Sequence, residues 1–551
     1  MSLASVEKSA NELHPRYIGA PSPISVEDAL SRFAAPAGSA VKVQILRPFS
    51  VYSKTAYSSV MTLPVGPAYI ASMLEAAGYA VDIIDAQGES ILDLRSAGNG
   101  RYKIQGLSTE EVIARIDPDA AVLGISLMFS QEWPLHRELL REIHRAYPDL
   151  IIVAGGEHST AMPELLLESD IGIEYVVKGE GEIPFLELLH CLATDDPPTD
   201  IGGIVYIDPE GNYVDGGLSR RILDIDNLPW PAWHKCEVPA YFTGNWSSGI
   251  AHGRNMPILA TRGCPYQCTF CSNPTMWTTR YVMRDPALVV DEIEHLIDTY
   301  GANSIDFADL TAIVRTDWIL SFCAELERRK LDLNWQLPSG TRSEALDESA
   351  LQALLRSGCS FLVFAPESGS QATLDQIRKR LKIDNIRATV GAAVDVGHTV
   401  KINFIIGFPD ERRGSILKTV WECVRMAFRG ANDCNVAIFT PYPGSELYRE
   451  MRDNGQIPEP DDKYFLDLLV QFDFTVIKSH CLAVPGWELA LYRFFAMSSF
   501  YSLSYLLHPG RLWRAIRSVV GGDFQAHSLF EQRVHDFVVR ARMSRRGRGR
   551  S

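Results

Sequence analysis

Short apolar runs alternate with amphipathic segments along the first part of the chain. Segments such as 66–79 show the apolar spacing of a helix. Strands that are apolar throughout and separated by helices are typical of a parallel, doubly wound sheet, which binds ligands at the carboxyl ends of its strands. We therefore predict an α/β Rossmann-like doubly wound domain over residues 41–195, preceded by a poorly ordered or loosely docked leader at 1–40. The runs that predict its buried strands are 41–48, 80–86, 120–128 and 150–159.

The same alternation begins again after residues 196–255, which are rich in Gly, Pro and Asp and predict a linker with a small hairpin. Its first helix has clear end signals, with Asp285 as N-cap, Pro286 in the first turn and Gly301 at the end. Six strand–helix units predict a partial (β/α)6 TIM-like barrel over 256–450, with its functional residues at the C-terminal rim of the strands. The six strands are expected at 257–261, 304–310, 333–340, 360–368, 400–409 and 434–443.

The remaining residues, 451–551, predict a mainly helical region with a basic tail, "VRARMSRRGRGRS". The aromatic and apolar stretch 490–507 is too short and too rich in hydroxyl groups to span a bilayer. Two interpretations stay open for this region. It forms a helical cap over the barrel, or it contacts a lipid surface or a hydrophobic substrate.

Composition excludes some classes of function. A net charge of -15 argues against a general nucleic-acid binder, because such proteins neutralise phosphates with clustered Lys and Arg. The first residues lack a basic start followed by an apolar run, so we expect a cytoplasmic protein. Ten cysteines in such a chain are not a disulfide framework, and seven of them lie scattered in apolar segments as core residues.

The other three cysteines cluster in "TRGCPYQCTFCSNP", at Cys264, Cys268 and Cys271. Structural zinc sites need four ligands, and electron-transfer iron–sulfur proteins use four thiolates per cluster. Three thiolates on one loop suit three irons of a [4Fe-4S] cluster and leave the fourth iron open for chemistry. The loop follows the first barrel strand, at the rim where active sites lie.

This C-x3-C-x2-C spacing, with the aromatic Phe270 before the last cysteine, resembles the radical S-adenosylmethionine (SAM) superfamily. The resemblance implies that the three cysteines bind a [4Fe-4S] cluster whose unique iron chelates SAM. The motif "PESGS" places Glu367 and Ser368 at the nucleoside, and "IIGFPDE" places Ile406 and Gly407 near the adenine. In place of the Gly-Gly-Glu run that holds the methionyl amine in many members, this chain has "DFADLT", with Asp309 as the candidate.

The first domain lacks the G-x-G-x-x-G fingerprint of nicotinamide binding. Its segments "LPVGPAYIASMLEAAGY", "GISLM", "AGGEHS" and "VVKGEGE" resemble the cobalamin-binding domain fused to a branch of the radical enzymes. No D-x-H-x-x-G motif is present, and for His158 a structural hydrogen bond is favoured over a role as cobalt ligand. A domain that has lost cobalamin is the alternative. The resemblance implies cobalamin contacts from Ser126, Gly155, Gly156, Gly179 and Glu180.

With both cofactors, the reaction that this resemblance implies is methylation of an unactivated carbon of a small-molecule or lipid-like substrate. The alternatives are an oxidative cyclase or ring-rearranging enzyme, similar to the anaerobic magnesium-protoporphyrin monomethyl ester cyclase, and an RNA methylthiotransferase-like modifier. No catalytic acid or base is identified. Expected partners are the substrate, an electron donor such as flavodoxin or ferredoxin, and a membrane surface, with no nucleic acid.

Overall fold

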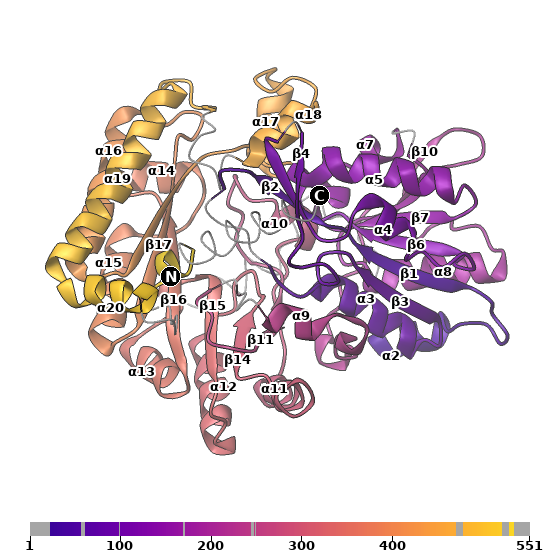
Figure 1. Cartoon of the computed structure of the whole chain (residues 1–551), viewed down its shortest axis with the longest axis horizontal. Helices are drawn as coiled ribbons and strands as arrows, with labels where there is room; N and C mark the ends of the chain where they lie inside the picture. The colour runs from indigo at the N-terminus through magenta and orange to yellow at the C-terminus, as the bar shows by residue number, and fades with distance from the viewer. Residues whose placement is uncertain are drawn as a thin grey trace.

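The structure, a computed structural model, consists of two lobes that are each built on their own sheet (Figure 1). It describes residues 23–56, 61–98, 100–168, 171–243, 247, 249–469, 478–520 and 528–533, with side chains to residue 514 in the last helix. None of the helices within these ranges has both the length and the apolar character needed to cross a membrane.

The sheet of the first lobe has seven strands, and its order confirms the doubly wound topology. The chain runs from β1 to β3 on one side and then crosses over to β6, β7 and β8 on the other, all in parallel. The strand order therefore reverses between β1 and β6, where open α/β sheets bind their ligands. In order across the sheet, the strands are β10 (Tyr213–Asp215), β9 (Ile204–Ile207), β8 (Ile173–Val177), β7 (Ile151–Gly155), β6 (Val122–Ser126), β1 (Lys42–Arg47) and β3 (Ala80–Asp85).

Two features of this lobe differ from expectation. The hairpin expected in the linker is β9–β10, and it extends the first sheet through antiparallel pairing with β8. A second sheet of three short strands was not predicted: β2 (Ser50–Ser53), β5 (Tyr102–Gln105) and β4 (Leu94–Ala97).

Helices cover both faces of the first sheet, and α3 and α8 pack together on one of them. Residues 1–22 of the predicted leader lie outside the described residues. From Ser25, however, the leader forms helix α2, which buries Val26 and Ala29 against this lobe, so this part of the leader is docked rather than poorly ordered. The helices are α2 (Val26–Arg32), α3 (Val65–Ala76), α4 (Thr109–Ile113), α5 (Trp133–Ala146), α6 (Glu157–Ala161), α7 (Pro163–Leu167), α8 (Glu182–Thr194) and, after the sheet, α9 (Val238–Phe242).

The second lobe contains six parallel strands in sequence order, as predicted. Its first and last strands, β11 and β18, do not pair with each other, so the barrel is incomplete. The strands are β11 (Asn255–Ile258), β14 (Ser304–Phe307), β15 (Asn334–Thr341), β16 (Cys359–Glu367), β17 (Thr399–Ile406) and β18 (Asp433–Ile438), and a short pair, β12 (Thr261–Arg262) and β13 (Val282–Met283), follows β11.

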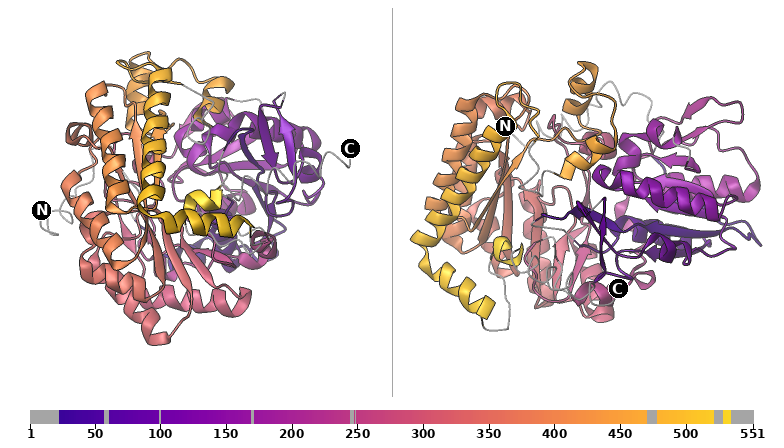
Figure 2. Two further views of the ribbon diagram at one scale, coloured as in Figure 1. Left: turned by 60° about the vertical axis from the view of Figure 1, so that its left-hand side comes forward. Right: turned by 45° about the horizontal axis from the view of Figure 1, so that its top comes forward.

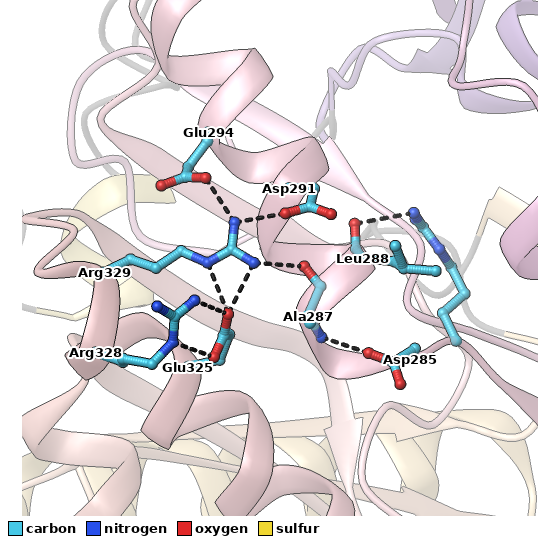
Figure 3. A network of polar contacts seen from close by, with 9 residues as sticks. Asp285, Ala287, Leu288, Asp291, Glu294, Glu325, Arg328 and Arg329 are labelled. Atoms are coloured by element: carbon cyan, nitrogen blue, oxygen red, sulfur yellow. Dashed lines mark hydrogen bonds and ion pairs between the residues drawn. The ribbon is translucent and has the colours of Figure 1, made fainter.

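The barrel helices pack on the outside of these strands (Figure 2). The predicted end signals of α11 are confirmed, since the Asp285 carboxylate accepts the Ala287 N–H at 2.8 Å and Gly301 is left-handed. Arg329 joins α11 to α12 by reaching Asp291 and Glu294 (Figure 3). The outer helices are α11 (Pro286–Tyr300), α12 (Thr316–Arg329), α13 (Glu348–Arg356), α14 (Gln371–Gln376), α15 (Ile383–Val396) and α16 (Arg413–Arg429), whereas α10 (Asn273–Trp277) and α17 (Glu446–Asp453) contact the first lobe.

The predicted helical C-terminal region comprises α18 (Asp462–Asp467), α19 (Gly486–Leu507) and α20 (Pro509–Val520). The long helix α19 lies along α16 and β18 on the outside of the barrel. Helix α18 instead contacts the first lobe, where Asp462 accepts a hydrogen bond from Arg137 of α5 at 2.9 Å. The basic tail lies outside the described residues.

A buried ion-pair network joins the two lobes. Arg262, on β12, donates to Glu180 at 3.0 Å and to Glu182 at 2.6 Å, and both acidic residues lie just after β8 in the first lobe. The guanidinium side chain is 3% exposed and lies over the rings of Tyr69 and Trp277. Glu182 therefore has Arg262 as its ion-pair partner in a region shielded from water, while Glu180 is shared between Arg262 and Arg221.

We predict that Arg262→Met lowers the free energy of unfolding by about 3–5 kcal/mol, because it leaves the buried Glu182 carboxylate without its ion-pair partner and Glu180 with Arg221 alone. Differential scanning calorimetry and denaturant titration measure this loss. The matched control is Arg141→Met, which removes a partly exposed arginine paired with Glu138 on α5 and should change stability by at most about 1 kcal/mol. Equal effects of the two substitutions would contradict the role assigned to the seam.

Candidate functional site

The loop with the three cysteines lies at the C-terminal rim of the barrel, between β12 and α10. The Thr269 N–H donates to the Ile377 carbonyl, after β16, at 3.1 Å, and the Thr269 carbonyl accepts the Leu447 N–H, after β18, at 2.9 Å. The Cys264 thiol lies 3.7 Å from the hydroxyl of Thr311, after β14. The loop is thus anchored to the carboxyl ends of several strands, where the sequence predicted it.

The three thiols are free and partly exposed. Burial raises the pKa of Cys268 and Cys271, and the nearby ammonium of Lys379 opposes the shift at Cys268. Among the described residues, no three His, Cys, Asp or Glu side chains are arranged to hold a single metal ion. A [4Fe-4S] cluster differs in its demand, because each thiolate binds a different iron, and three free thiols on one anchored loop fit that donor set.

Glu367 ends β16 in an unusual conformation beside this loop. Its φ is 70°, and its Oε1 accepts a hydrogen bond from the Lys379 ammonium at 2.7 Å, while Oε2 has no hydrogen bond among the described residues. The Lys379 ammonium also lies 5.9 Å from the centre of the Phe270 ring, next to Cys271 in the chain. Glu367 therefore presents one oriented, uncommitted oxygen close to the cysteine loop.

The backbone around Lys379 is strained. Arg378 and Arg380 flank it with φ of 53° and 49°, in the left-handed region that non-glycine residues rarely occupy. Each such residue costs about 1–3 kcal/mol and persists where its surroundings hold it in place, often at functional sites. Arg342 supplies part of that hold, because it donates to the carbonyls of Lys379 and Arg380 at 3.1 Å and lies 3.7 Å from the centre of the Tyr266 ring on the cysteine loop.

Ser368, Ile406 and Gly407, the other predicted nucleoside contacts, are engaged in packing and hydrogen bonds within the protein. The Ser368 hydroxyl contacts Thr419 of α16 at 3.1 Å and is fully buried. Ile406 is fully buried in the core of the barrel lobe. The Gly407 N–H donates to Glu411 at 2.7 Å, and a Cβ at Gly407 would lie 2.7 Å from Leu489 of α19. Of the predicted nucleoside contacts, only Glu367 directs an uncommitted polar side-chain atom at the cysteine loop.

The carboxylate of Asp309 is also engaged in hydrogen bonds within the protein. Its carboxylate accepts the Ala260 N–H at 3.1 Å and the Thr261 hydroxyl, so it fixes the end of β11 from which the cysteine loop departs. Burial raises the pKa of Asp309 to about 6. Asp309 therefore positions the loop, and the structure does not support it as the replacement for the methionyl-amine contact.

The predicted cobalamin residues with small side chains lie at one edge of the first sheet. Ser126 and Gly155 are neighbours in register at the carboxyl ends of β6 and β7, and Gly179 follows β8. Gly156 is required by the fold itself, because its φ is 107° and a Cβ would lie 2.6 Å from the Leu127 carbonyl. A Cβ at Gly155, in contrast, would meet only Val177 at 3.9 Å, so its backbone leaves the space that a flat ligand needs.

The side chains of Glu180 and His158 do not support a cobalamin role. The Glu180 carboxylate is taken up by Arg262, by Arg221 at 3.0 Å and by the Ile222 N–H at 3.1 Å, so the predicted contact is corrected to a role at the seam. His158 is buried, and its Nδ1 lies 2.9 Å from the Ser130 hydroxyl, as the structural interpretation expected. Burial lowers the pKa of His158 to about 3.

The two predicted sites adjoin each other. The Ser272 hydroxyl, one residue after Cys271, donates to Glu157, one residue after Gly156. A cavity of about 180 Å³ also lies between the lobes, lined by residues 61–65 of the first lobe, by Tyr241 of α9 and by barrel residues that include Asn255, Asp306 and Ser339. The edge of the sheet with Gly155 and Gly156 thus meets the barrel at the cysteine loop.

Four residues of this site were not predicted from the sequence: Lys379, Arg342, Glu157 and Ser272. Lys379 and Arg342 lie outside the motifs that identified the other residues. Ser272 directly follows the cysteine motif, and Glu157 lies within "AGGEHS", so a search next to the recognised motifs would have found these two. No local pattern identifies Lys379, because its role depends on a left-handed backbone and on a partner from β16.

Comparison with known families agrees with this arrangement. Residues 56–189 match the family model of the B12 binding domain, and residues 258–420 match that of the Radical SAM superfamily. The first match covers most of the strands of the first sheet, and the second covers the cysteine loop, Glu367 and Gly407.

Two curated relatives match most of the chain. The cytidylyl-2-hydroxyethylphosphonate methyltransferase of Streptomyces wedmorensis is 28% identical over 78% of this chain and 83% of its own length. The anaerobic magnesium-protoporphyrin IX monomethyl ester cyclase of Rubrivivax gelatinosus is 28% identical over 72% of this chain and 67% of its own.

The solved structure of TsrM, a radical S-adenosylmethionine methyltransferase from Kitasatospora setae, has the same fold, with a TM-score of 0.61 and 16% identity over 92% of this chain and 99% of its own. The fold class predicted from the sequence is confirmed. The chain therefore consists of a B12 binding domain followed by a domain of the radical SAM superfamily.

Proposed function

We propose that this protein is a cobalamin-dependent radical SAM enzyme that methylates an unactivated carbon of a small-molecule or lipid-like substrate. The observation that carries the proposal is the contact between Glu157 and Ser272, because it brings the ligand edge of the B12-binding lobe to the loop of three cysteines. A [4Fe-4S] cluster with SAM supplies a 5′-deoxyadenosyl radical, and methylcobalamin supplies the methyl group.

The residues present fit these groups. Cys264, Cys268 and Cys271 offer three free thiols for the cluster, and Glu367 offers a carboxylate oxygen to the ribose hydroxyls of SAM. Gly155 leaves room for a corrin, and Ser126 beside it offers a hydroxyl to the nucleotide tail. The chain's own part is to bind, orient and shield these groups, since the cofactors carry the difficult chemistry.

Lys379 and Arg342 act on this site as positioning residues. The Lys379 ammonium holds the Glu367 carboxylate and places a positive charge near the thiol of Cys268. Arg342 fixes Lys379 through its backbone and contacts the cysteine loop through Tyr266. Together they keep the nucleoside-binding carboxylate and the cluster ligands in one fixed geometry.

A second candidate function is supported by the cyclase among the relatives, which is as similar to this chain as the methyltransferase. An oxidative cyclase or ring-rearranging enzyme would use the same cluster and SAM without transfer of a methyl group. Product analysis separates the two, because only the methylase yields S-adenosylhomocysteine together with a methylated product.

The proposed partners follow from this chemistry. A small-molecule substrate would enter the cavity between the lobes, and a reductant such as flavodoxin or ferredoxin would reduce the cluster. A membrane surface is a further proposed partner, supported by exposed apolar side chains on the C-terminal helices. The proposed location is the cytoplasm, which agrees with ten cysteines that are all free.

We predict that Cys268→Ala abolishes formation of 5′-deoxyadenosine from SAM, because two thiolates do not hold the cluster. Assays use protein reconstituted without oxygen in the presence of a chemical reductant. The matched control is Cys191→Ala, a free cysteine of α8 outside the loop, which should retain iron and cleavage. Cleavage by Cys268→Ala at the rate of the native protein would refute the cluster assignment.

We predict that Lys379→Met makes the reduction potential of the cluster more negative by an amount on the order of tens of millivolts, because a cation near the cluster ligands favours the reduced form. It should also weaken SAM binding, since Glu367 loses the partner that orients it. Potentiometric titration and equilibrium binding measure the two effects. Lys379→Arg should retain most of both properties, and Lys382→Met, at an exposed lysine nearby, should change neither. A wild-type potential and affinity in Lys379→Met would rule out this role.

A further inference from the structure

The outside of the barrel carries a continuous surface of exposed apolar side chains on α16, α19 and α20, which we call the outer helical surface. Large side chains on it are exposed by 45% to 75%, although monomeric proteins rarely leave extended apolar patches uncovered. Its members are Leu417, Trp421 and Phe428 of α16, Trp487, Leu491, Phe494, Phe495 and Leu506 of α19, and Leu512 and Trp513 of α20.

These helices form one surface because they lie side by side and are tied at both ends. Arg413, at the start of α16, makes two hydrogen bonds of 2.7 Å to Glu488, at the start of α19. Beyond the other end, Arg511 of α20 donates to the carbonyls of Gly430 and Ala431, which follow α16. The two long helices therefore run parallel, and both views in Figure 2 place them next to each other on the outside of the barrel.

The exposed side chains of α19 are not needed to attach it to the barrel. Leu489, Ala496 and Phe500 are fully buried and recur at helical spacing on one side. Trp487, Leu491 and Phe494 are on the opposite side of the same helix. The barrel buries only one of the two apolar sides of α19, so the other side is available to a second apolar environment.

The charged residues of the three helices indicate which kind of partner the outer helical surface binds. The three helices carry eight Lys and Arg residues and two Glu residues, in a chain whose net charge is -15. Both glutamates are neutralised, because Glu422 is buried and paired with Arg387, and Glu488 is paired with Arg413. Arg425 remains partly exposed beside Trp421, with its guanidinium 5.8 Å from the ring centre. Of the cations whose side chains the structure describes, Arg493 is buried and Arg429 is paired with Asp395, while Lys418, Arg425 and Arg514 are exposed, so the surface is apolar with three exposed cations.

We infer that the outer helical surface binds the surface of a membrane that contains anionic lipids. Trp, Phe and Leu side chains flanked by Arg and Lys are the composition of helices that lie in the interface of a bilayer, where apolar groups enter the headgroup boundary and cations meet lipid phosphates. Like charges on two copies would repel each other, which disfavours pairing of this surface with a second copy of the chain. The inference does not depend on which reaction the barrel carries out.

The test measures sedimentation of the full-length holoenzyme with vesicles. Native protein should bind vesicles of mixed phosphatidylglycerol and phosphatidylcholine more tightly than vesicles of pure phosphatidylcholine, and added salt should weaken the binding. The variant Trp487→Ser/Phe494→Ser/Phe495→Ser should bind the mixed vesicles at least about tenfold more weakly, because it removes three aromatic groups that enter the interface. The variant Lys418→Gln/Arg425→Gln should lose most of the preference for the anionic lipid.

The matched control is Ile207→Ser/Tyr213→Ser, which removes two exposed apolar side chains from β9 and β10 in the other lobe and should bind like the native protein. Melting temperature and SAM cleavage show whether each variant is folded. The inference is overturned if the native protein binds neither vesicle type, or if binding is insensitive to lipid charge and to the triple substitution. It is also overturned if sedimentation velocity shows a dimer that the triple substitution dissociates, because the surface would then bind a second copy.

Discussion

The contact of Arg262 with Glu180 and Glu182 is the constraint on which the rest of the site depends. Arg262 lies two residues before the first cysteine of the loop, and its acidic partners lie directly after β8 of the other lobe. Because all three side chains are shielded from water, the lobes cannot move apart here without breaking both buried ion pairs of Arg262. The seam thus fixes the cysteine loop relative to the ligand edge of the first sheet.

A second set of contacts, within the barrel, holds the cysteine loop and Glu367 in place. The cysteine loop is anchored to segments that follow three different strands, and Asp309 holds the backbone from which the loop starts. Lys379, between two left-handed arginines, reaches both Glu367 and the neighbourhood of Cys268. Strain in this segment is balanced by the contacts of Arg342. Such rigidity suits an enzyme whose cofactors are reactive, since small displacements of a reacting group cost much of the rate.

Much of this could be predicted from the sequence, and for physical reasons. Strands buried on both faces leave continuous apolar runs, so four of the five parallel strands of the first lobe and all six of the barrel were found, and the spacing of Cys264, Cys268 and Cys271 identified the loop. The three-stranded sheet was missed because its strands are short and most residues of β4 and β5 are only partly buried. Helix α2 was missed because the Ala- and Pro-rich composition of its surroundings outweighed the capping signal of Ser25 and Asp28.

The roles of site residues were harder to predict from the sequence than the positions of helices and strands. Family motifs indicated Glu180, Ser368 and Gly407 as cofactor contacts, but a motif does not specify which groups of the protein a residue already binds. In the structure these residues are engaged by Arg262, by Thr419 and by Glu411. The contact of Glu157 with Ser272 joins residues 115 positions apart, and the role of Lys379 depends on backbone angles, so neither leaves a local pattern.

The central claim is that one chain holds an iron–sulfur cluster and a corrin at the seam between its lobes. The most direct test is the iron, sulfide and cobalt content of protein reconstituted without oxygen in the presence of cobalamin, after unbound metal and corrin are removed. We predict about four irons, about four sulfides and about one cobalt per chain. Iron and sulfide without cobalt would contradict the claim for the first lobe, and the absence of both iron and sulfide would contradict it for the barrel.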